Sequence, residues 1–337
     1  MRPFGHIERL DRRVMLTGDL VNGLLDLGEL LDGEPLAALA DEAIEPQYVV
    51  NHPPRLQPGD MPLDGTSAYD GFDRLDLVWQ TLTVGDGIQD SFQVRYRKVG
   101  DSLWNTIAEP VDSFDAMSPP RVMHSSTLLG LDWDSEYEYQ VSHLRGNEVV
   151  ETFADSFRTR LKQGDEQAFS FAAYGDSANA GPKIVNFRAV QAQINRQDLD
   201  FSVLLGDNVY TFGTHGEADH RMKPAISPEA ADWTARKMDY FGIGNHDFFV
   251  ETGQTSRDLY AVPIPEAGLN AYASLPEGEF AEHSYSFDYG DTHFVTFDTN
   301  LVEFWLDRNN HDPNERELRI NRLLDYVVAD LAASDAQ

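Results

Sequence analysis

The stretch FSVLLGDNVY, residues 201–210, decides the fold class. A mostly apolar run ends in Gly206 and Asp207, as a buried strand does where it turns out of a sheet. Two further runs, residues 169–174 and 240–243, also end in a glycine followed by an oxygen-bearing side chain. Helical patterns lie between the runs. The sequence therefore predicts βαβ units built around parallel strands.

The residues that follow these glycines are candidate ligands. They are Asp176, Asp207 and Asn245. Ligands of α/β proteins gather at the carboxyl ends of the strands, so we expect these three side chains to converge. The glycine before each one lets the backbone turn sharply and approach a bound ion. A single Gly-Asp pair is ordinary turn chemistry, and only the three in this order make a specific signal.

Oxygen ligands with a neighbouring histidine indicate metal chemistry. Hard cations prefer oxygen donors, and imidazole with oxygen suits iron, zinc and manganese. A carboxylate such as Asp207 can bridge two ions, and a two-metal centre binds phosphate and lowers the pKa of a trapped water. His246 follows Asn245 and could donate a hydrogen bond or a proton to an ester or its leaving group.

These motifs resemble those of the calcineurin-like metallophosphoesterases, and most closely those of the purple acid phosphatases. The resemblance implies that Asp176 holds the first metal ion and that Asp207 bridges both. It also implies that Tyr210 ligates the first ion, that Asn245 ligates the second, and that His246 assists at the phosphate.

Tyr210 points to the subfamily. Generic metallophosphoesterases carry a histidine two residues after the first aspartate, where this chain has Ala178. Purple acid phosphatases lack that histidine and use a tyrosinate three residues after the bridging aspartate, which is the position of Tyr210. A phenolate favours ferric iron. The resemblance thus implies a binuclear centre of Fe(III) with Zn, Mn or Fe(II), the alternative for Tyr210 being an aromatic that packs at a strand end.

The chain divides into three predicted regions. Residues 1–53 are a helical, export-like segment, which ends where Asn51-His52-Pro53-Pro54 breaks the pattern. Residues 54–161 alternate apolar and polar positions between turns and predict an antiparallel β-sandwich, similar to a fibronectin type III domain and acting as a scaffold. Residues 166–337 are the α/β metallophosphoesterase domain, an αββα sandwich by the resemblance. The fold class is therefore mixed.

The resemblance to the purple acid phosphatases is incomplete in the last third of the chain. Residues 285–294 predict the strand pair of the family, and an amphipathic helix follows, with an apolar stripe at Ile320, Leu323, Leu324, Val327, Val328 and Leu331. The family's remaining histidine ligands belong to motifs beyond that helix. His215 and His220, in the loop after Tyr210, could approach substrate, but we expect them to be solvated loop residues. His283, His293 and His311 do not stand in those motifs. We therefore expect a C-terminally incomplete domain, from a fragment or a truncated gene product.

The composition of the chain excludes several classes of binding partner and chemistry. The 337 residues carry 26 basic and 57 acidic side chains, a net charge of −31, which excludes unaided binding to nucleic acid or an anionic membrane. The absence of cysteine excludes disulfides and thiolate chemistry. No apolar run is long enough to span a bilayer. Residues 8–16 resemble the short N-terminal signature of some large exported bacterial surface proteins, which implies an extracellular or cell-surface location.

The sequence thus predicts a metal-dependent phosphoric monoester hydrolase of the acid phosphatase type, acting on a small phosphate ester. Two alternatives stay open. One is a phosphodiesterase or nucleotidase of the same superfamily. The other is a catalytically inactive surface module, because the C-terminal histidine ligands are absent.

Overall fold

The computed structural model describes residues 47–58, 74–84, 90–107, 111–116, 120–179, 183–249, 254–260, 284–300 and 313–334. The chain divides into two units, Met1–Ile44 and Glu45–Gln337, and every described residue belongs to the second. The predicted export-like segment therefore lies largely outside the described residues, as do His283 and His311.

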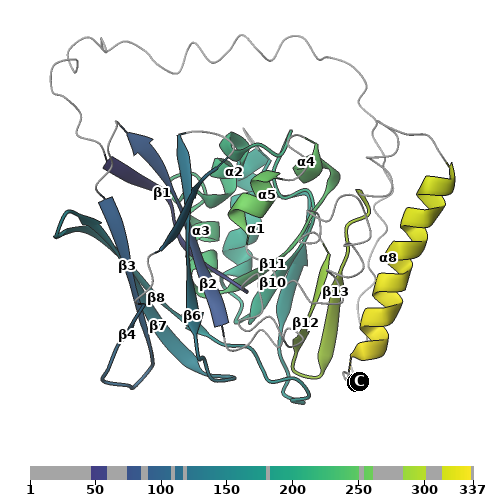
Figure 1. Ribbon diagram of the computed structural model, residues 1–337, viewed down its shortest axis with the longest axis horizontal. Helices are drawn as coiled ribbons and strands as arrows, with labels where there is room; N and C mark the ends of the chain where they lie inside the picture. The colour runs from purple at the N-terminus through teal and green to yellow at the C-terminus, as the bar shows by residue number, and fades with distance from the viewer. Residues whose placement is uncertain are drawn as a thin grey trace, which may run out of the picture. The chain divides into compact units, whose positions relative to one another are not determined.

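The amino-terminal part of the second unit is a pair of four-stranded antiparallel sheets (Figure 1). One sheet has the order β1-β2-β6-β5 and the other has the order β4-β3-β7-β8. Their strands are β1 (Gln47–Gln57), β2 (Arg74–Val84), β3 (Asp90–Lys98), β4 (Asn105–Thr106), β5 (Asp112–Asp115), β6 (Arg121–Leu129), β7 (Glu136–Arg145) and β8 (Glu148–Arg158). The alternating apolar pattern of this region thus forms the antiparallel sheets that it predicts.

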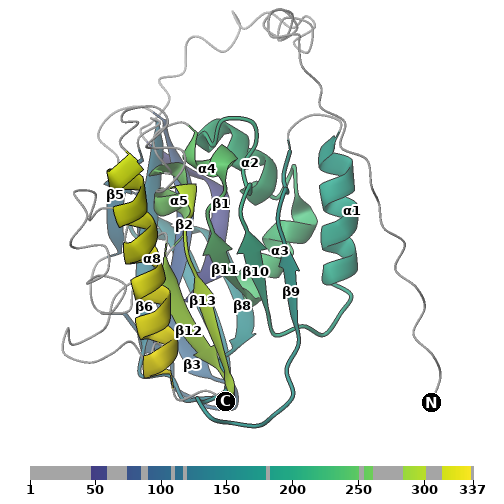
Figure 2. The same ribbon diagram turned by 90° about the vertical axis from the view of Figure 1, so that its right-hand side faces the viewer.

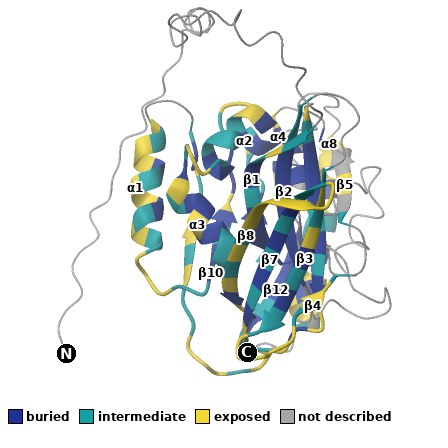
Figure 3. Ribbon diagram, turned by 90° about the vertical axis from the view of Figure 1, so that its left-hand side faces the viewer, coloured by how far each residue is buried: buried dark blue, intermediate teal, exposed yellow. Residues whose placement is uncertain are grey.

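Aromatic side chains fill the space between the two sheets. The Trp79 ring of β2 lies 5.1 Å from the Phe92 ring of β3, and Phe92 lies 4.9 Å from the His124 ring of β6. Asp76 and Val78, on the other face of β2, are buried as well, and Figure 3 shows this strand mostly in the colour of buried residues. The strand β2 is therefore covered on both faces.

The strand β1 contradicts the predicted interruption of regular structure near its prolines. We expected Asn51-His52-Pro53-Pro54 to interrupt regular structure, and instead β1 runs through these residues from Gln47 to Gln57. Two register shifts against β2, between Val50 and His52 and between His52 and Arg55, accommodate the two prolines. Since β1 is an edge strand, a proline without an N–H costs no central ladder bond.

The second part contains the predicted parallel strands. The three strands β9 (Phe171–Tyr174), β10 (Phe201–Leu205) and β11 (Met238–Gly242) form a parallel sheet of order β11-β10-β9. Its helices are α1 (Ile184–Ile194), α2 (His215–Met222), α3 (Pro228–Arg236), α4 (Asn245–Phe248) and α5 (Gln254–Leu259). The described residues thus form a sheet-rich mixed fold, as the sequence predicts.

A β-hairpin covers the parallel sheet. It consists of β12 (Tyr285–Tyr289) and β13 (Thr292–Thr296), joined at the predicted Gly290 turn. The Phe287 ring stacks on Tyr240 of β11 with centroids 3.5 Å apart, and Tyr289 lies 4.6 Å from Phe201 of β10. Buried apolar residues form one continuous cluster from the β-sandwich to this hairpin. Both parts of the unit therefore share a hydrophobic core.

The last described helix, α8 (Pro313–Ala333), lies beside the hairpin (Figure 2). Its Asp330 accepts a hydrogen bond from Ser286 Oγ at 2.7 Å and lies 2.8 Å from His293 Nε2. Arg319, Tyr326 and Asp330 are buried, whereas the predicted apolar stripe is exposed at Ile320, Leu324, Val328 and Leu331. The predicted helix is therefore present, and four residues of its apolar stripe are exposed. No described helix is long and apolar enough to cross a membrane.

The contact between α8 and the hairpin predicts a pH dependence. Hydrogen bonds to Asp288 and Asp330 raise the pKa of His293 from 6.5 to about 9. Because the folded-state pKa exceeds the unfolded one, the imidazolium stabilises the fold fully below pH 6.5, and this contribution is lost as the pH rises through 9. We expect the free energy of unfolding to fall by about 1–2 kcal/mol over that range, discounted for partial solvation.

The measurement is urea unfolding followed by circular dichroism at several pH values, with His293→Gln as the control. Glutamine keeps a hydrogen-bonding side chain but does not titrate, so the variant should show a flatter profile. Equal slopes for the two proteins would contradict this assignment.

Candidate metal centre

The three glycine turns of the parallel strands meet at one edge of the sheet. A Cβ atom added to Gly175 would lie 2.9 Å from the Gly206 carbonyl oxygen, and one added to Gly206 would lie 2.8 Å from Gly244 Cα. Gly206 also has a φ of +96°, which side chains rarely adopt. Larger residues would push the strand ends apart, and so glycine is what allows the following residues to converge.

The two aspartates that follow these glycines have unusual backbones. Asp176 and Asp207 both adopt a φ of +52°, in the left-handed region. Their loops are tied together, because the Asp176 N–H donates to the Gly206 carbonyl at 3.1 Å and the Ser177 N–H donates to the Asp207 carbonyl at 2.9 Å. A non-glycine residue in this region costs about 1–3 kcal/mol, and such residues cluster at functional sites. Both candidate ligands therefore lie on strained backbone.

Tyr210 joins the two carboxylates. Its hydroxyl donates to Asp176 Oδ1 at 2.5 Å and lies 2.9 Å from Asp207 Oδ2. Burial and the hydrogen bonds to both carboxylates raise the pKa of Tyr210, because each opposes a negative phenolate. Three oxygen side chains from two strand ends thus converge, with a phenolic proton between the carboxylates.

Asn245 and His246 come from the third strand end. Asn245 begins α4 directly after Gly244, which is packed against the Asp207 backbone and side chain. The His246 N–H donates to Asp207 Oδ1 at 3.0 Å, and the His246 ring lies 4.4 Å from the Tyr210 ring. The His246 Nδ1 lies 2.7 Å from the Thr211 carbonyl, which can only accept, so Nδ1 carries a proton and Nε2 is left for other partners.

Asp247 is a positioning residue that sequence reasoning missed. Its fully buried carboxylate accepts hydrogen bonds from the backbone N–H groups of Asn208 at 3.0 Å, Val209 at 2.8 Å and Gly244 at 2.9 Å. Burial raises the pKa of Asp247 to about 6, although these hydrogen bonds act in the opposite direction. Asp247 could have been predicted to cap helix α4, because it stands three residues after the N-cap Gly244.

Helix α2 holds two loops of the candidate site in place. At its first turn, Glu217 accepts hydrogen bonds from the N–H groups of Thr211, Phe212 at 2.9 Å and Thr214 at 3.1 Å. Near its end, the buried Arg221 donates to Ser177 Oγ at 2.9 Å. The helix thereby fixes both the loop after Tyr210 and the loop that carries Asp176. Thr214-x-x-Glu217 is a capping box, which the sequence could have revealed.

The histidines after Tyr210 correct another prediction. We expected His215 and His220 in a solvated loop, and both lie in α2. His215 is buried, with Nε2 2.8 Å from Asp258 Oδ2, so its imidazole holds α2 to α5. The buried contact with Asp258 gives His215 a structural role.

The donor set fits a hard cation. Within the described ranges, no group of three or more histidine, aspartate or glutamate side chains is arranged to hold a metal ion. The site here has two carboxylates and a phenol, which together offer the oxygen donors that ferric iron prefers. A cation would take the place of the phenolic proton. The residues fit part of a metal centre, and their role as ligands stays a prediction.

Comparisons with known proteins support the fold alone. No protein-family model and no curated protein matches the chain. Among solved structures, a purple acid phosphatase from yellow lupin (Lupinus luteus) seeds matches with a TM-score of 0.51 and 17% identity, over 75% of this chain and 47% of that chain. The chain therefore spans about half the length of that phosphatase, and its fold is similar to the corresponding half.

Other matches are too low in score to carry an argument. The vertebrate membrane protein astrotactin-2 matches with a TM-score of 0.24 and 13% identity, over 42% of this chain and 29% of that chain. A glycosyl hydrolase family 2 member from Bacteroides cellulosilyticus matches with a TM-score of 0.26 and 7% identity, over 59% of this chain and 32% of that chain.

Proposed function

We propose that this chain carries part of a binuclear metal centre of the purple acid phosphatase type and acts in the hydrolysis of phosphoric monoesters. The observation that carries the proposal is the convergence of the Asp176 and Asp207 carboxylates on the Tyr210 hydroxyl. The similarity in fold to a purple acid phosphatase supports it. Phosphodiester or nucleotide hydrolysis would use the same centre and is the related alternative.

Each residue has a role in this proposal. Asp176 and Tyr210 would hold a ferric ion, Asp207 would bridge to a zinc, manganese or ferrous ion, and Asn245 would ligate that second ion. When bound, such a centre supplies positive charge for phosphoryl oxygens and lowers the pKa of water. The Thr211 carbonyl keeps a proton on Nδ1 of His246, which leaves Nε2 to exchange a proton with the ester or its leaving group.

We further propose that the β-sandwich is a fibronectin type III-like scaffold and that the second part is an αββα metallophosphoesterase domain. The strand orders β1-β2-β6-β5 and β4-β3-β7-β8 support the first assignment. So does Tyr137, near the start of β7, whose hydroxyl accepts a hydrogen bond from the Asp132 N–H at 2.9 Å. This contact has the form of the tyrosine corner of such sandwiches. The boundaries at residues 54–161 and 166–337, and the extracellular location, remain predictions.

A catalytically inactive module is the second candidate. It is favoured by the finding that the described residues contain no group of three histidine, aspartate or glutamate side chains suited to a metal ion. The two candidates differ in whether the chain, once it holds iron at Tyr210, also hydrolyses a phosphate ester.

The test is the visible spectrum of the chain after incubation with ferric iron and zinc. We expect a tyrosinate-to-iron absorption band, turnover of a chromogenic phosphate ester, and loss of the band in Tyr210→Phe. This variant keeps both carboxylates, and its iron affinity should fall at least about tenfold, as when ligand shells are disturbed.

Tyr96→Phe is the matched control, because the Tyr96 hydroxyl donates to Leu129 within the sandwich and should not affect the band. Iron binding without turnover would favour the inactive module. The metal-centre assignment would be contradicted if the wild-type chain bound no iron. It would also be contradicted if the tyrosinate-to-iron band persisted in Tyr210→Phe.

A further inference from the structure

Two aromatic pairs connect the same two segments of the candidate centre. The Tyr210 ring lies 4.4 Å from the His246 ring, and the Phe212 ring lies 5.7 Å from the Phe249 ring. His246 and Phe249 are three residues apart, in α4 and at its C-cap, so they occupy one face of that turn. The phenylalanine pair is therefore next to the pair that contains the proposed catalytic histidine.

The phenylalanine pair combines exposure with a fixed backbone. Phe212 is 47% exposed and Phe249 is 37% exposed. The Phe212 N–H donates to Glu217 at 2.9 Å, and a Cβ atom on Gly213 would lie 2.6 Å from the His246 carbonyl oxygen. Hence the loop that carries Phe212 is closely packed on the segment that carries His246. Two partly exposed rings are thus carried by closely packed segments.

An exposed aromatic pair beside the proposed phosphate-binding centre suits a flat apolar group. Aromatic pairs contribute about 0.5–1.5 kcal/mol beyond the area that they bury, and burial of apolar surface adds to this. The phosphoryl group would be held by the centre, so the adjacent rings would be in reach of the alcohol part of an ester. A small polar alcohol would gain nothing from them.

We propose that Phe212 and Phe249 form a leaving-group subsite that selects phosphate monoesters of aromatic alcohols over those of small alkyl alcohols. This inference rests on the proposed function, because it needs the phosphoryl group at the Asp176, Asp207 and Tyr210 centre. It adds a substrate class and two specificity-determining residues. Neither phenylalanine takes part in the chemical step.

Binding of non-hydrolysable probes tests the subsite without turnover. The full chain, loaded with iron and zinc, is titrated with phenylphosphonate and with methylphosphonate in a calorimeter. We expect wild type to bind phenylphosphonate about tenfold more tightly, equivalent to about 1.4 kcal/mol. In the double variant Phe212→Ala/Phe249→Ala the two dissociation constants should become equal within about twofold, while the methylphosphonate value stays unchanged.

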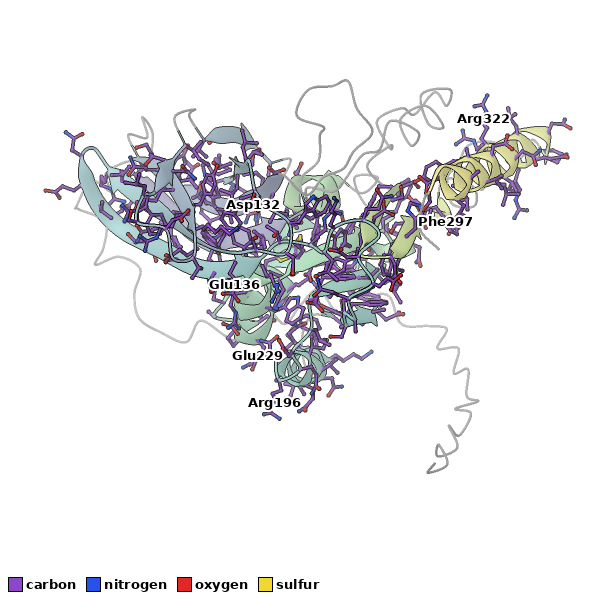
Figure 4. The ribbon with its side chains drawn as sticks, turned by 90° about the horizontal axis from the view of Figure 1, so that it is seen from below. Asp132, Glu136, Arg196, Glu229, Phe297 and Arg322 are labelled. Carbon is purple, nitrogen blue, oxygen red and sulfur yellow. The ribbon has the colours of Figure 1, made fainter. Side chains whose placement is uncertain are left out.

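Phe297→Ala is the matched control. Phe297 is 48% exposed, follows β13 and lies near the hairpin and α8 (Figure 4), so its loss should leave the preference intact. A thermal melt of each variant checks that the fold is kept. The subsite would be contradicted if wild type bound both phosphonates with equal affinity, or if the preference persisted in the double variant. Neither result would contradict the proposed phosphate-binding centre. Binding of neither phosphonate would overturn both.

Discussion

Replacement of Arg221 by methionine is expected to lower the free energy of unfolding by about 3–5 kcal/mol, the cost of removing one partner from a buried ion pair. Arg221 is 1% exposed and lies 3.5 Å from Asp239 Oδ2, and Asp239 is fully buried. It also donates to Ser177 Oγ at 2.9 Å and to the Tyr174 hydroxyl at 3.1 Å. Methionine fills similar space but leaves these acceptors without their donor.

Urea unfolding followed by tryptophan fluorescence measures this effect. Arg221→Lys keeps the charge without the planar fork and should give an intermediate loss. The control is Arg188→Met, because Arg188 pairs with Glu229 at the surface at 3.2 Å and its loss should cost no more than about 1 kcal/mol. If Arg221→Met were as stable as Arg188→Met, the buried pair would not support the fold.

Helix α2 also explains how the β-sandwich contributes to the site. Its Asp219 lies 2.6 Å from His52 Nε2 of β1 and 3.1 Å from Arg121 Nη2 of β6. Burial lowers the pKa of His52 to about 4, so at neutral pH an uncharged imidazole donates this hydrogen bond. The same helix presents Glu217 and Arg221 to the candidate centre. The sandwich therefore positions the site through α2, although it supplies none of the proposed ligands.

Local patterns were sufficient to predict the parallel strands and their turns. An apolar run that ends in glycine and a carboxylate has few alternatives, and the convergence of Asp176 and Asp207 follows from strand direction. The role of Arg221 could not be predicted in this way, because its partner Ser177 is distant in sequence and no local pattern links them. The orientation of α8 could not be predicted from the sequence for a similar reason. Its apolar stripe is clear, but the contacts of Asp330 with the hairpin decide which face turns inward.

The β-strand through Pro53 and Pro54 shows the limit of breaker rules. Prolines end regular structure when their missing N–H would leave a gap in a ladder. At the edge of a sheet, with register shifts on either side of His52, no such gap arises. Whether a strand lies at an edge depends on the strand order, which a single sequence does not reveal.

Asp247→Ala is expected to destabilise the chain by about 3–5 kcal/mol and to abolish the iron band, although Asp247 is not a proposed ligand. Its carboxylate accepts the N–H groups of Asn208, Val209 and Gly244, and each unsatisfied buried donor costs about 1–3 kcal/mol before water enters the space. The loops that carry Asp207 and Asn245 would then separate.

Asp247→Asn retains one accepting oxygen and should lose less stability, so the order of the two variants reports on hydrogen bonding. Asp132→Ala is the surface control, because Asp132 is 67% exposed and pairs only with Lys98 among the ion pairs of the described residues. Its loss should change the unfolding free energy by less than about 1 kcal/mol. If Asp247→Ala kept the iron band at full strength, the loops would hold their positions without it. The rigidity of the centre would then come from the contacts of Gly175, Gly206 and Gly244 together with those of α2.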